Sequence, residues 1–201
     1  IWINFTTLYH LIFVVKIKNN MRVCIIGDGI SSLTLAKALI NENIYVDIFT
    51  TKKNNLLNKS RTIGISKSNI EYFNSNILNI DKITWKIKNI EIFSENLKNE
   101  KILNFRSNDN QLFSILRNYQ LYEMLKKDLS KNKFFKKKYL NFNSSLIKNY
   151  EIVIITDYSH IFTKKFFSKK IIKKYKGLAY TTIVKHKKIP NITATQIFTK
   201  N

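Results

Sequence analysis

Residues 22–40, RVCIIGDGISSLTLAKALI, decide the fold of this chain. The run Arg22–Ile26 is continuously apolar after its first residue, which is typical of a strand buried on both faces of a parallel sheet. Two glycines follow, and apolar residues then recur at helical spacing from Ile30 to Ile40. Ile44–Phe49 (IYVDIF) supplies a second strand. Strand, turn, helix and strand within about thirty residues predict a βαβ unit with parallel strands.

The turn itself, Gly27-Asp28-Gly29-Ile30-Ser31-Ser32, predicts a dinucleotide site. Such a site needs a tight turn at Gly27, close backbone approach of a pyrophosphate at Gly29, and a helix N-terminus that favours the anion. Ser32 stands where a third glycine is usual, and its small side chain still lets helix and strand pack closely. A purely structural glycine turn is the alternative.

An acidic residue at the end of the second strand ordinarily binds the adenosine ribose of a dinucleotide. Thr50 occupies that place, whereas Asp47 lies within the strand and points to the opposite face. Thr50 offers only a neutral hydrogen bond, which is weaker than a charge-assisted one. We therefore assign Thr50 to the cofactor site and expect it to contribute less than an acid would.

Composition places the chain among globular proteins. It has 201 residues, of which 44% are hydrophobic, and a net charge of +22. Of its 35 basic residues 31 are Lys, beside 25 Asn and 32 Ile, three residue types with codons rich in A and T. Because nucleic-acid interfaces favour Arg, we interpret the charge as a solvated lysine surface and expect no specific nucleic-acid partner. A basic RNA-binding or membrane-surface-binding protein is the alternative.

Sequence features also bear on compartment and metals. One cysteine, Cys24, excludes an internal disulfide and a cysteine zinc site, which favours a reducing, cytoplasmic location. The three histidines are far apart in the sequence, so we predict no metal site. No apolar run reaches the roughly 18 residues of a membrane span.

Downstream elements follow from the same patterns. We expect a helix capped by Ser66, a helix that starts at Asn118, and strands at 83–93, 112–116 and 152–156. We also expect a hairpin-like pairing of 180–185 with 192–198, and loops or solvated helix faces at the lysine clusters 136–138 and 169–174. Residues 1–20 precede Met21 and are interpreted as a non-native or disordered extension, and the whole as a fragment.

Four stretches carry a family resemblance: GDGISSLTLAKAL (27–39), RTIGIS (61–66) before a helix, LRNYQLYEML (116–125) and IVIITDYS (152–159). Over nearly all of 21–201, the chain resembles the N-terminal half of a class A FAD-dependent aromatic hydroxylase, the fold family of para-hydroxybenzoate hydroxylase. It is most similar to the ubiquinone-biosynthesis hydroxylases.

The resemblance implies an α/β fold: a Rossmann-like FAD-binding domain with an inserted β-rich segment, truncated, in which 175–201 begins the substrate layer. It implies that Arg61 lies near the flavin, Arg117 near its ribityl or phosphate part, and Asp157 near the ribityl side. Tyr158 stands where the family has a glycine, which obstructs close backbone approach. The implied cofactor residues are Gly27, Gly29, Ser32, Thr50, Arg61, Arg117 and Asp157.

The implied function is a monooxygenase that uses FAD, NAD(P)H and O₂ to hydroxylate a small aromatic ring, such as a prenylated phenol in ubiquinone biosynthesis. The flavin carries the chemistry, so no catalytic side chain is expected. A prenyl substrate would place the enzyme at the inner membrane face, where lysines meet anionic lipid. A non-catalytic flavoprotein-like relative is the alternative, because Ser32, Thr50 and Tyr158 all depart from the family pattern at cofactor contacts.

Overall fold

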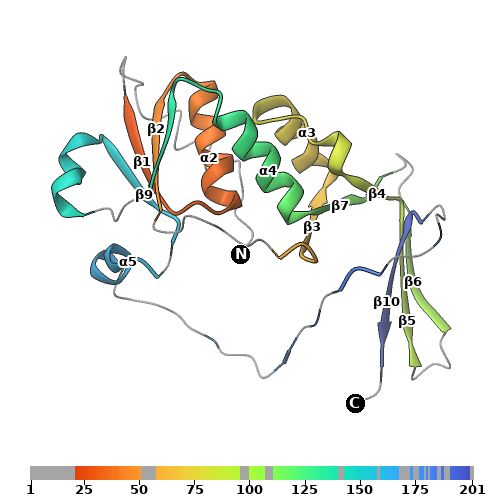
Figure 1. The fold of residues 1–201 in the computed structure, drawn as a ribbon. Coiled ribbons are helices and arrows are strands. Elements are labelled where there is room, and N and C mark those ends of the chain that lie inside the picture. Colours follow the sequence, from red (N-terminus) through yellow and green to blue (C-terminus); the bar gives the residue numbers. More distant parts are fainter. Residues whose placement is uncertain are drawn as a thin grey trace.

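A parallel sheet forms the centre of the protein in the computed structural model (Figure 1). The structure describes residues 21–50, 58–95, 100–106, 111–139, 143–157, 159–167, 173, 177, 178, 180, 182–184, 187 and 191–199. The four strands of this sheet lie in the order β8-β2-β1-β9 and all run parallel. Their bounds are Phe135–Lys138 for β8, Tyr45–Phe49 for β2, Arg22–Ile26 for β1 and Ile152–Ile155 for β9. The predicted βαβ unit is therefore confirmed.

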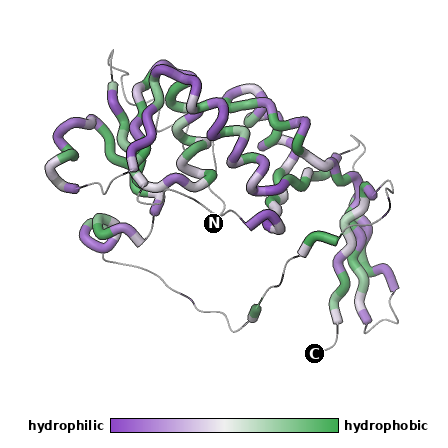
Figure 2. Tube along the Cα trace, in the orientation of Figure 1, coloured by the Kyte–Doolittle hydropathy of each residue, from purple (hydrophilic) through white to green (hydrophobic). Residues whose placement is uncertain are grey.

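Each face of this sheet has its own core. Helices α2 (Ile30–Asn41) and α4 (Asn118–Leu129) pack together on one face, where the larger core lies. The short helices η3 (Ser144–Asn149) and α5 (Ile161–Phe166) follow β8 and β9 and contribute to a smaller core on the other face. Hydrophobic and hydrophilic residues alternate along the strands and helices of these layers (Figure 2), and the buried residues are mostly hydrophobic. The sheet is thus covered on both sides, as its apolar strands predicted.

The lysine cluster 136–138 corrects one prediction, because it is a strand and not a loop or a solvated helix face. Lys137 and Lys138 belong to β8 and pair in register with Ile48 and Phe49 of β2. Each lysine has a buried carboxylate partner, Asp28 for Lys137 and Asp47 for Lys138. These ion pairs make lysine compatible with a sheet position. The cluster 169–174 lies outside the described residues except for Lys173, which is in no regular element.

A second, antiparallel sheet has the order β3-β7-β4. It contains β3 (Thr62–Ser66), β7 (Phe113–Arg117) and β4 (Trp85–Ile87), and helix α3 (Lys67–Asn76) follows β3. The hydroxyl of Ser66 accepts a hydrogen bond from the amide of Asn69 at 3.3 Å, so the predicted helix cap is confirmed. Helix α4 begins at Asn118 as predicted.

A third sheet has the order β10-β5-β6. Strand β10 (Thr193–Phe198) runs parallel to β5 (Asn89–Ser94), which is antiparallel to β6 (Glu100–Arg106). The predicted pairing of 192–198 with 180–185 is not found among the described residues: β10 hydrogen-bonds to β5, and residues 180 and 182–184 lie in no strand. The predicted strand 83–93 is divided among the 3₁₀ helix η1 (Asp81–Ile83), β4 and β5, which belong to different sheets.

Within the described residues, no helix is both long and apolar enough to cross a bilayer. In the same part of the chain, no three His, Cys, Asp or Glu side chains gather closely enough to hold a metal ion. Residues 1–20 lie outside the described residues, so their interpretation as an extension stays a prediction.

Candidate dinucleotide site

The carboxyl end of the parallel sheet brings several predicted residues together. The chain leaves β1 to one face through α2 and leaves β9 to the other through α5, so strand order reverses between β1 and β9. Open α/β sheets bind ligands outside the carboxyl ends of their strands at such a switch point. Gly27, Gly29 and Asp157 all lie in the two loops that begin there.

Both the backbone conformation and the close surroundings of residue 27 require a glycine. Its φ is +114°, a conformation that side-chain-bearing residues rarely adopt. A Cβ at this position would lie 2.4 Å from Oγ1 of Thr156 and 3.2 Å from the amide nitrogen of Asp157. The amide of Gly27 donates to the carbonyl of Phe49 at 2.9 Å. The turn is thus held tightly against the ends of both β2 and β9.

Gly29 differs, because the space beside it is open. It is the N-cap of α2, with ordinary extended backbone, and no atom lies within 4 Å of where its Cβ would be. No side chain caps this helix, and its first turn contains no acidic residue. The first-turn amides of a helix have no intrahelical partner and carry partial positive charge. The geometry at Gly29 therefore suits an anion that approaches the backbone closely.

Ser32 points away from this open space and into the protein. Its side chain is fully buried, and its hydroxyl lies 2.7 Å from that of Thr156. The Thr156 hydroxyl also donates to the carbonyl of Ile26 at 2.8 Å. Sequence reasoning assigned Ser32 to the cofactor and missed Thr156. The structure shows a hydrogen bond between helix and strand where a third glycine would give close packing alone.

The carboxylate of Asp47 is bonded to side chains of neighbouring residues. Its carboxylate, 6% exposed, accepts hydrogen bonds from Nζ of Lys138 at 2.7 Å and from the Tyr150 hydroxyl at 2.6 Å. Arg22 adds a longer ion pair at 3.7 Å. Burial and the hydrogen bond to Asp47 raise the pKa of Tyr150. Burial and the charge of Asp47 raise the pKa of Cys24 to about 12. This cluster lies on the face opposite Thr50, as strand alternation predicted.

Thr50 lies at the end of β2, where the ribose position was predicted. It is buried, and its amide donates to the carbonyl of Lys138 at 3.1 Å. On the neighbouring strand β8, Nζ of Lys137 lies 2.9 Å from Oδ2 of Asp28. Burial lowers the pKa of Lys137, but the hydrogen bond and charge of Asp28 outweigh it and the net shift is upward. Sequence reasoning missed this pair, since nothing in the sequence places residue 137 next to the glycine turn.

Arg61, which directly precedes β3, and Arg117, the last residue of β7, are neighbours at one end of the second sheet. Thr62 pairs with Arg117, and the amide of Asn118 donates to the carbonyl of Arg61 at 3.0 Å. Both arginines are exposed. Oδ1 of Asn118 is buried and has no hydrogen-bond partner, and no side chain caps α4. Two basic residues and an unsatisfied acceptor thus lie at the start of α4.

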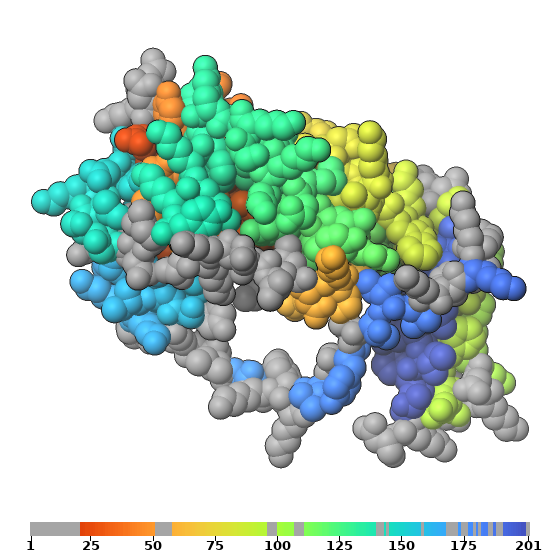
Figure 3. Space-filling model, viewed as in Figure 1, coloured from red at the N-terminus to blue at the C-terminus, as the bar shows by residue number. Residues whose placement is uncertain are grey.

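The starts of α2 and α4 lie at the same edge of the molecule, because the two helices pack together and both begin at the lower side in Figure 1. In the space-filling view the orange residues that lead into β3 lie directly beside the green residues around the start of α4 (Figure 3). This edge therefore joins the glycine turn to the arginine pair. Of the seven predicted cofactor residues, Arg61 and Arg117 lie near the start of α4. The other five lie at the carboxyl end of the parallel sheet: Gly27, Gly29, Ser32, Thr50 and Asp157.

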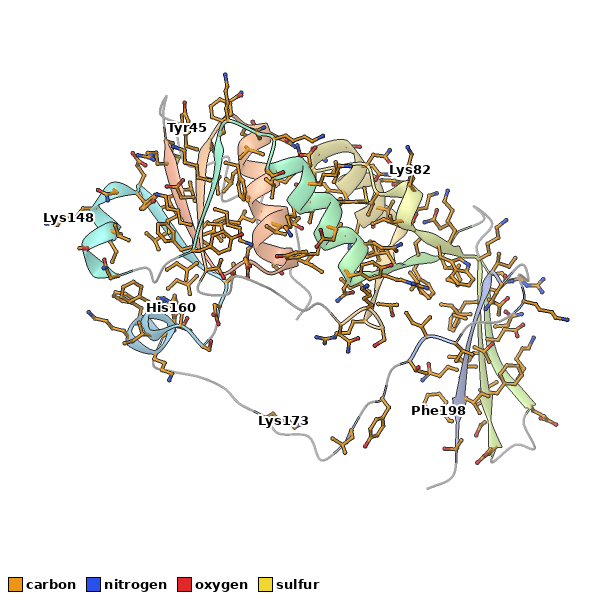
Figure 4. The ribbon with its side chains drawn as sticks, in the orientation of Figure 1. Tyr45, Lys82, Lys148, His160, Lys173 and Phe198 are labelled. Carbon is orange, nitrogen blue, oxygen red and sulfur yellow. The ribbon has the colours of Figure 1, made fainter. Side chains whose placement is uncertain are left out.

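Asp157 shapes the loop between β9 and α5. Its Oδ1 accepts hydrogen bonds from the amide and hydroxyl of Ser159, and its carbonyl accepts from the Thr163 hydroxyl. His160 caps α5 through Nδ1, which accepts from the amide of Phe162 (Figure 4). The obstruction predicted for Tyr158 falls outside the described residues.

Comparison with known proteins gives similarity in structure only. No protein-family model matches the sequence, and no curated protein is significantly similar to it. PqsL, described as a probable FAD-dependent monooxygenase from Pseudomonas aeruginosa, matches with a TM-score of 0.57 and 12% identity over 78% of this chain and 48% of that one. The p-nitrophenol 4-monooxygenase PnpA from Pseudomonas putida DLL-E4 matches with a TM-score of 0.51 and 14% identity over 59% and 31%. The chain therefore spans about half the length of PqsL and less than a third of the length of PnpA. Its mixed α/β fold, built around a parallel sheet, is similar to that of these FAD-dependent monooxygenases.

Proposed function

We propose that this chain is the FAD-binding part of a monooxygenase that hydroxylates an aromatic ring. The observation that carries the proposal is the turn at Gly27 and Gly29. The turn lies at the switch point of the parallel sheet. The φ of Gly27 requires a glycine there, and the space beside Gly29 is open to a ligand that approaches the backbone closely. The fold shared with FAD-dependent monooxygenases supports the same assignment.

The residues present fit a flavin dinucleotide. Gly29 leaves room where a Cβ would otherwise enter, and the uncapped first turn of α2 supplies amides for a pyrophosphate. Arg61 and Arg117 supply guanidinium groups, which suit phosphate oxygens. The unpartnered Oδ1 of Asn118 would accept a hydrogen bond from a ligand hydroxyl or amide. These features suit a ligand that is anionic in its middle and polar along its length.

In this proposal the protein binds and orients, and the flavin, when bound, supplies the reaction with NAD(P)H and O₂. The α2 amides hold the pyrophosphate, and Arg61 and Arg117 approach the cofactor from the start of α4. No nucleophilic side chain is needed. Cys24 is fully buried with a raised pKa, so its thiol takes no part.

The third sheet supports an apolar substrate. Register places Ile90 beside Phe105 and Ala194, and Ile92 beside Leu103 and Gln196, so these mostly apolar side chains share one face. Leu103 and Phe105 are about half exposed. The opposite face carries polar residues such as Glu91 and Thr195. An apolar face of this kind suits an aromatic ring, and a prenylated phenol in ubiquinone biosynthesis is our proposed substrate class.

Titration of the purified chain with FAD, followed by quenching of flavin fluorescence, tests the proposal. We expect saturable binding that Gly29→Ala weakens by about tenfold, since a methyl group enters the space for the anion. Gly64→Ala is the matched control, because Gly64 lies in β3 and a Cβ there meets only Phe113, at 3.7 Å. Failure of the chain to bind either FAD or ADP would refute the proposal.

A further inference from the structure

We propose that Asp28, held by Lys137, recognises the adenosine ribose of the dinucleotide in place of an acid at the end of β2. The inference rests on the proposed function and goes beyond it by naming the residues that select the sugar. Its ligand chemistry is a vicinal ribose diol attached to a pyrophosphate.

The position of the pair is the first argument. Asp28 follows β1 and Lys137 lies on β8, and these two strands flank β2 in the sheet. The 2.9 Å contact between Lys137 Nζ and Asp28 Oδ2 therefore bridges across the carboxyl end of β2. A ribose-binding acid ordinarily lies at that same strand end.

The face of the sheet is the second argument. Lys137 pairs with Ile48, so its side chain lies on the same face as Ile48, and Thr50 is two residues further along that strand. Lys137 and Thr50 thus share one face, the α2 side of the sheet, on which Ile48 is packed. Asp47 lies on the other face and is bonded to Lys138 and Tyr150. Asp28 is therefore the carboxylate that the fold brings to the predicted ribose position.

Chemistry is the third argument. The Asp28 side chain is 8% exposed and that of Lys137 is 15% exposed, so the pair lies in a region of low dielectric where hydrogen bonds discriminate strongly. A carboxylate accepts hydrogen bonds through two oxygens and an ammonium donates up to three. A diol both donates and accepts. The pair offers both complements, while Lys137 balances the negative charge that Asp28 would otherwise place beside a pyrophosphate.

Ligands that lack one hydroxyl test the inference directly. Calorimetry would compare ADP with 2′-deoxy-ADP and 3′-deoxy-ADP on the full chain. We expect ADP to bind about tenfold more tightly than at least one deoxy analogue, the loss typical of a hydrogen bond to a charged group. In Asp28→Asn, ADP and the deoxy analogues should bind about equally. The double variant Asp28→Asn/Thr50→Glu should restore the preference for ADP, because it returns an acid to the strand end.

Controls separate recognition from folding. Asp128→Asn removes another acid of the α2–α4 layer, one paired with Lys37 at 2.6 Å, and should leave the preference for ADP unchanged. If Asp28→Asn fails to fold, Lys137→Met provides the second variant, and it should also reduce the preference. Equal binding of ADP and both deoxy analogues by the unmodified chain would overturn the inference while the proposed function stands. Absence of any ADP and FAD binding would overturn both.

Discussion

The hydroxyl of Ser32 lies 2.7 Å from the hydroxyl of Thr156, a residue 124 positions further along the chain. This contact ties the first turn of α2 to the end of β9. Thr156 in turn donates to the carbonyl of Ile26, so β1, α2 and β9 meet through one pair of hydroxyls. A serine at the third position of the glycine turn is therefore compatible with a tightly packed switch point.

The losses of stability from removing the Ser32 and Thr156 hydroxyls should not be additive. Thr156→Val keeps the side-chain shape but leaves the fully buried Ser32 hydroxyl without this partner. We expect a loss of about 1–3 kcal/mol in the free energy of unfolding, measured by urea denaturation. The double variant Ser32→Ala/Thr156→Val should lose less than the sum of the two single variants. Strictly additive losses would show that the two hydroxyls do not interact. Ser31→Ala, at an exposed neighbouring position, is the control.

The two glycines of the turn should respond differently to alanine. Gly27→Ala meets Thr156 at 2.4 Å and forces a φ near +114° on a residue with a Cβ. We expect it to lower the free energy of unfolding by at least about 1–3 kcal/mol. Gly29→Ala meets no atom within 4 Å and should change stability by less than about 0.5 kcal/mol. Equal losses in the two variants would contradict the described turn geometry.

The arginine pair should affect binding without affecting stability. Arg61 and Arg117 are exposed, and the hydrogen bonds described for them use their backbones. Under the proposed function, Arg61→Gln or Arg117→Gln should raise the Kd for FAD by about tenfold, as expected for loss of a charge-assisted hydrogen bond. Arg106→Gln on β6, also exposed, is the matched control. An unchanged Kd in both variants would remove the arginines from the site.

Alkaline pH should destabilise the protein through Cys24. Its pKa rises from 9.0 to about 12 because the thiol is buried and lies near Asp47. The unfolded chain therefore releases this proton before the folded chain does. The stability that the protonated thiol contributes is intact below about pH 9 and is lost as pH rises toward 12. Over this range the free energy of unfolding should fall by at most about 1.4 kcal/mol per pH unit.

Cys24→Ala separates this effect from other groups. Lys138 and Tyr150 also have raised pKa values and lose stability in the same direction as pH rises. Unfolding measured between pH 8 and 11, a range chosen about the cysteine pKa, should show a shallower decline in the variant. An identical decline would show that the thiol does not contribute. Iodoacetamide should label Cys24 in the unfolded chain and not in the native one.

Much of the parallel sheet could be predicted from local patterns. Arg22–Ile26, the helix after Gly29 and the strand before Thr50 each carry their own periodicity, and the cap at Ser66 is local as well. Strand β8 could not be predicted, because three consecutive lysines carry no apolar pattern. Its stability depends on Asp28 and Asp47, which are 109 and 91 positions away in sequence.

Contacts within the candidate site were harder to predict than the identity of its residues. Gly27 and Gly29 could be assigned from the turn alone. The role of Ser32 could not, because its partner Thr156 comes from the last strand of the sheet. The adjacency of Arg61 and Arg117 depends on the pairing of β3 with β7, which the sequence between them does not indicate. Long-range pairing, and not local propensity, decides these features.

The parallel pairing of β10 with β5 has a consequence for the order in which the protein assembles. Asn89 and Thr193, which meet at 3.3 Å, are 104 positions apart. Contacts of such long sequence separation form late, because their loop-closure entropy is not repaid by local structure. During synthesis the β5–β6 hairpin would precede its third strand and present an open edge to other chains. Conditions that slow translation between these strands should therefore increase aggregation of nascent chains.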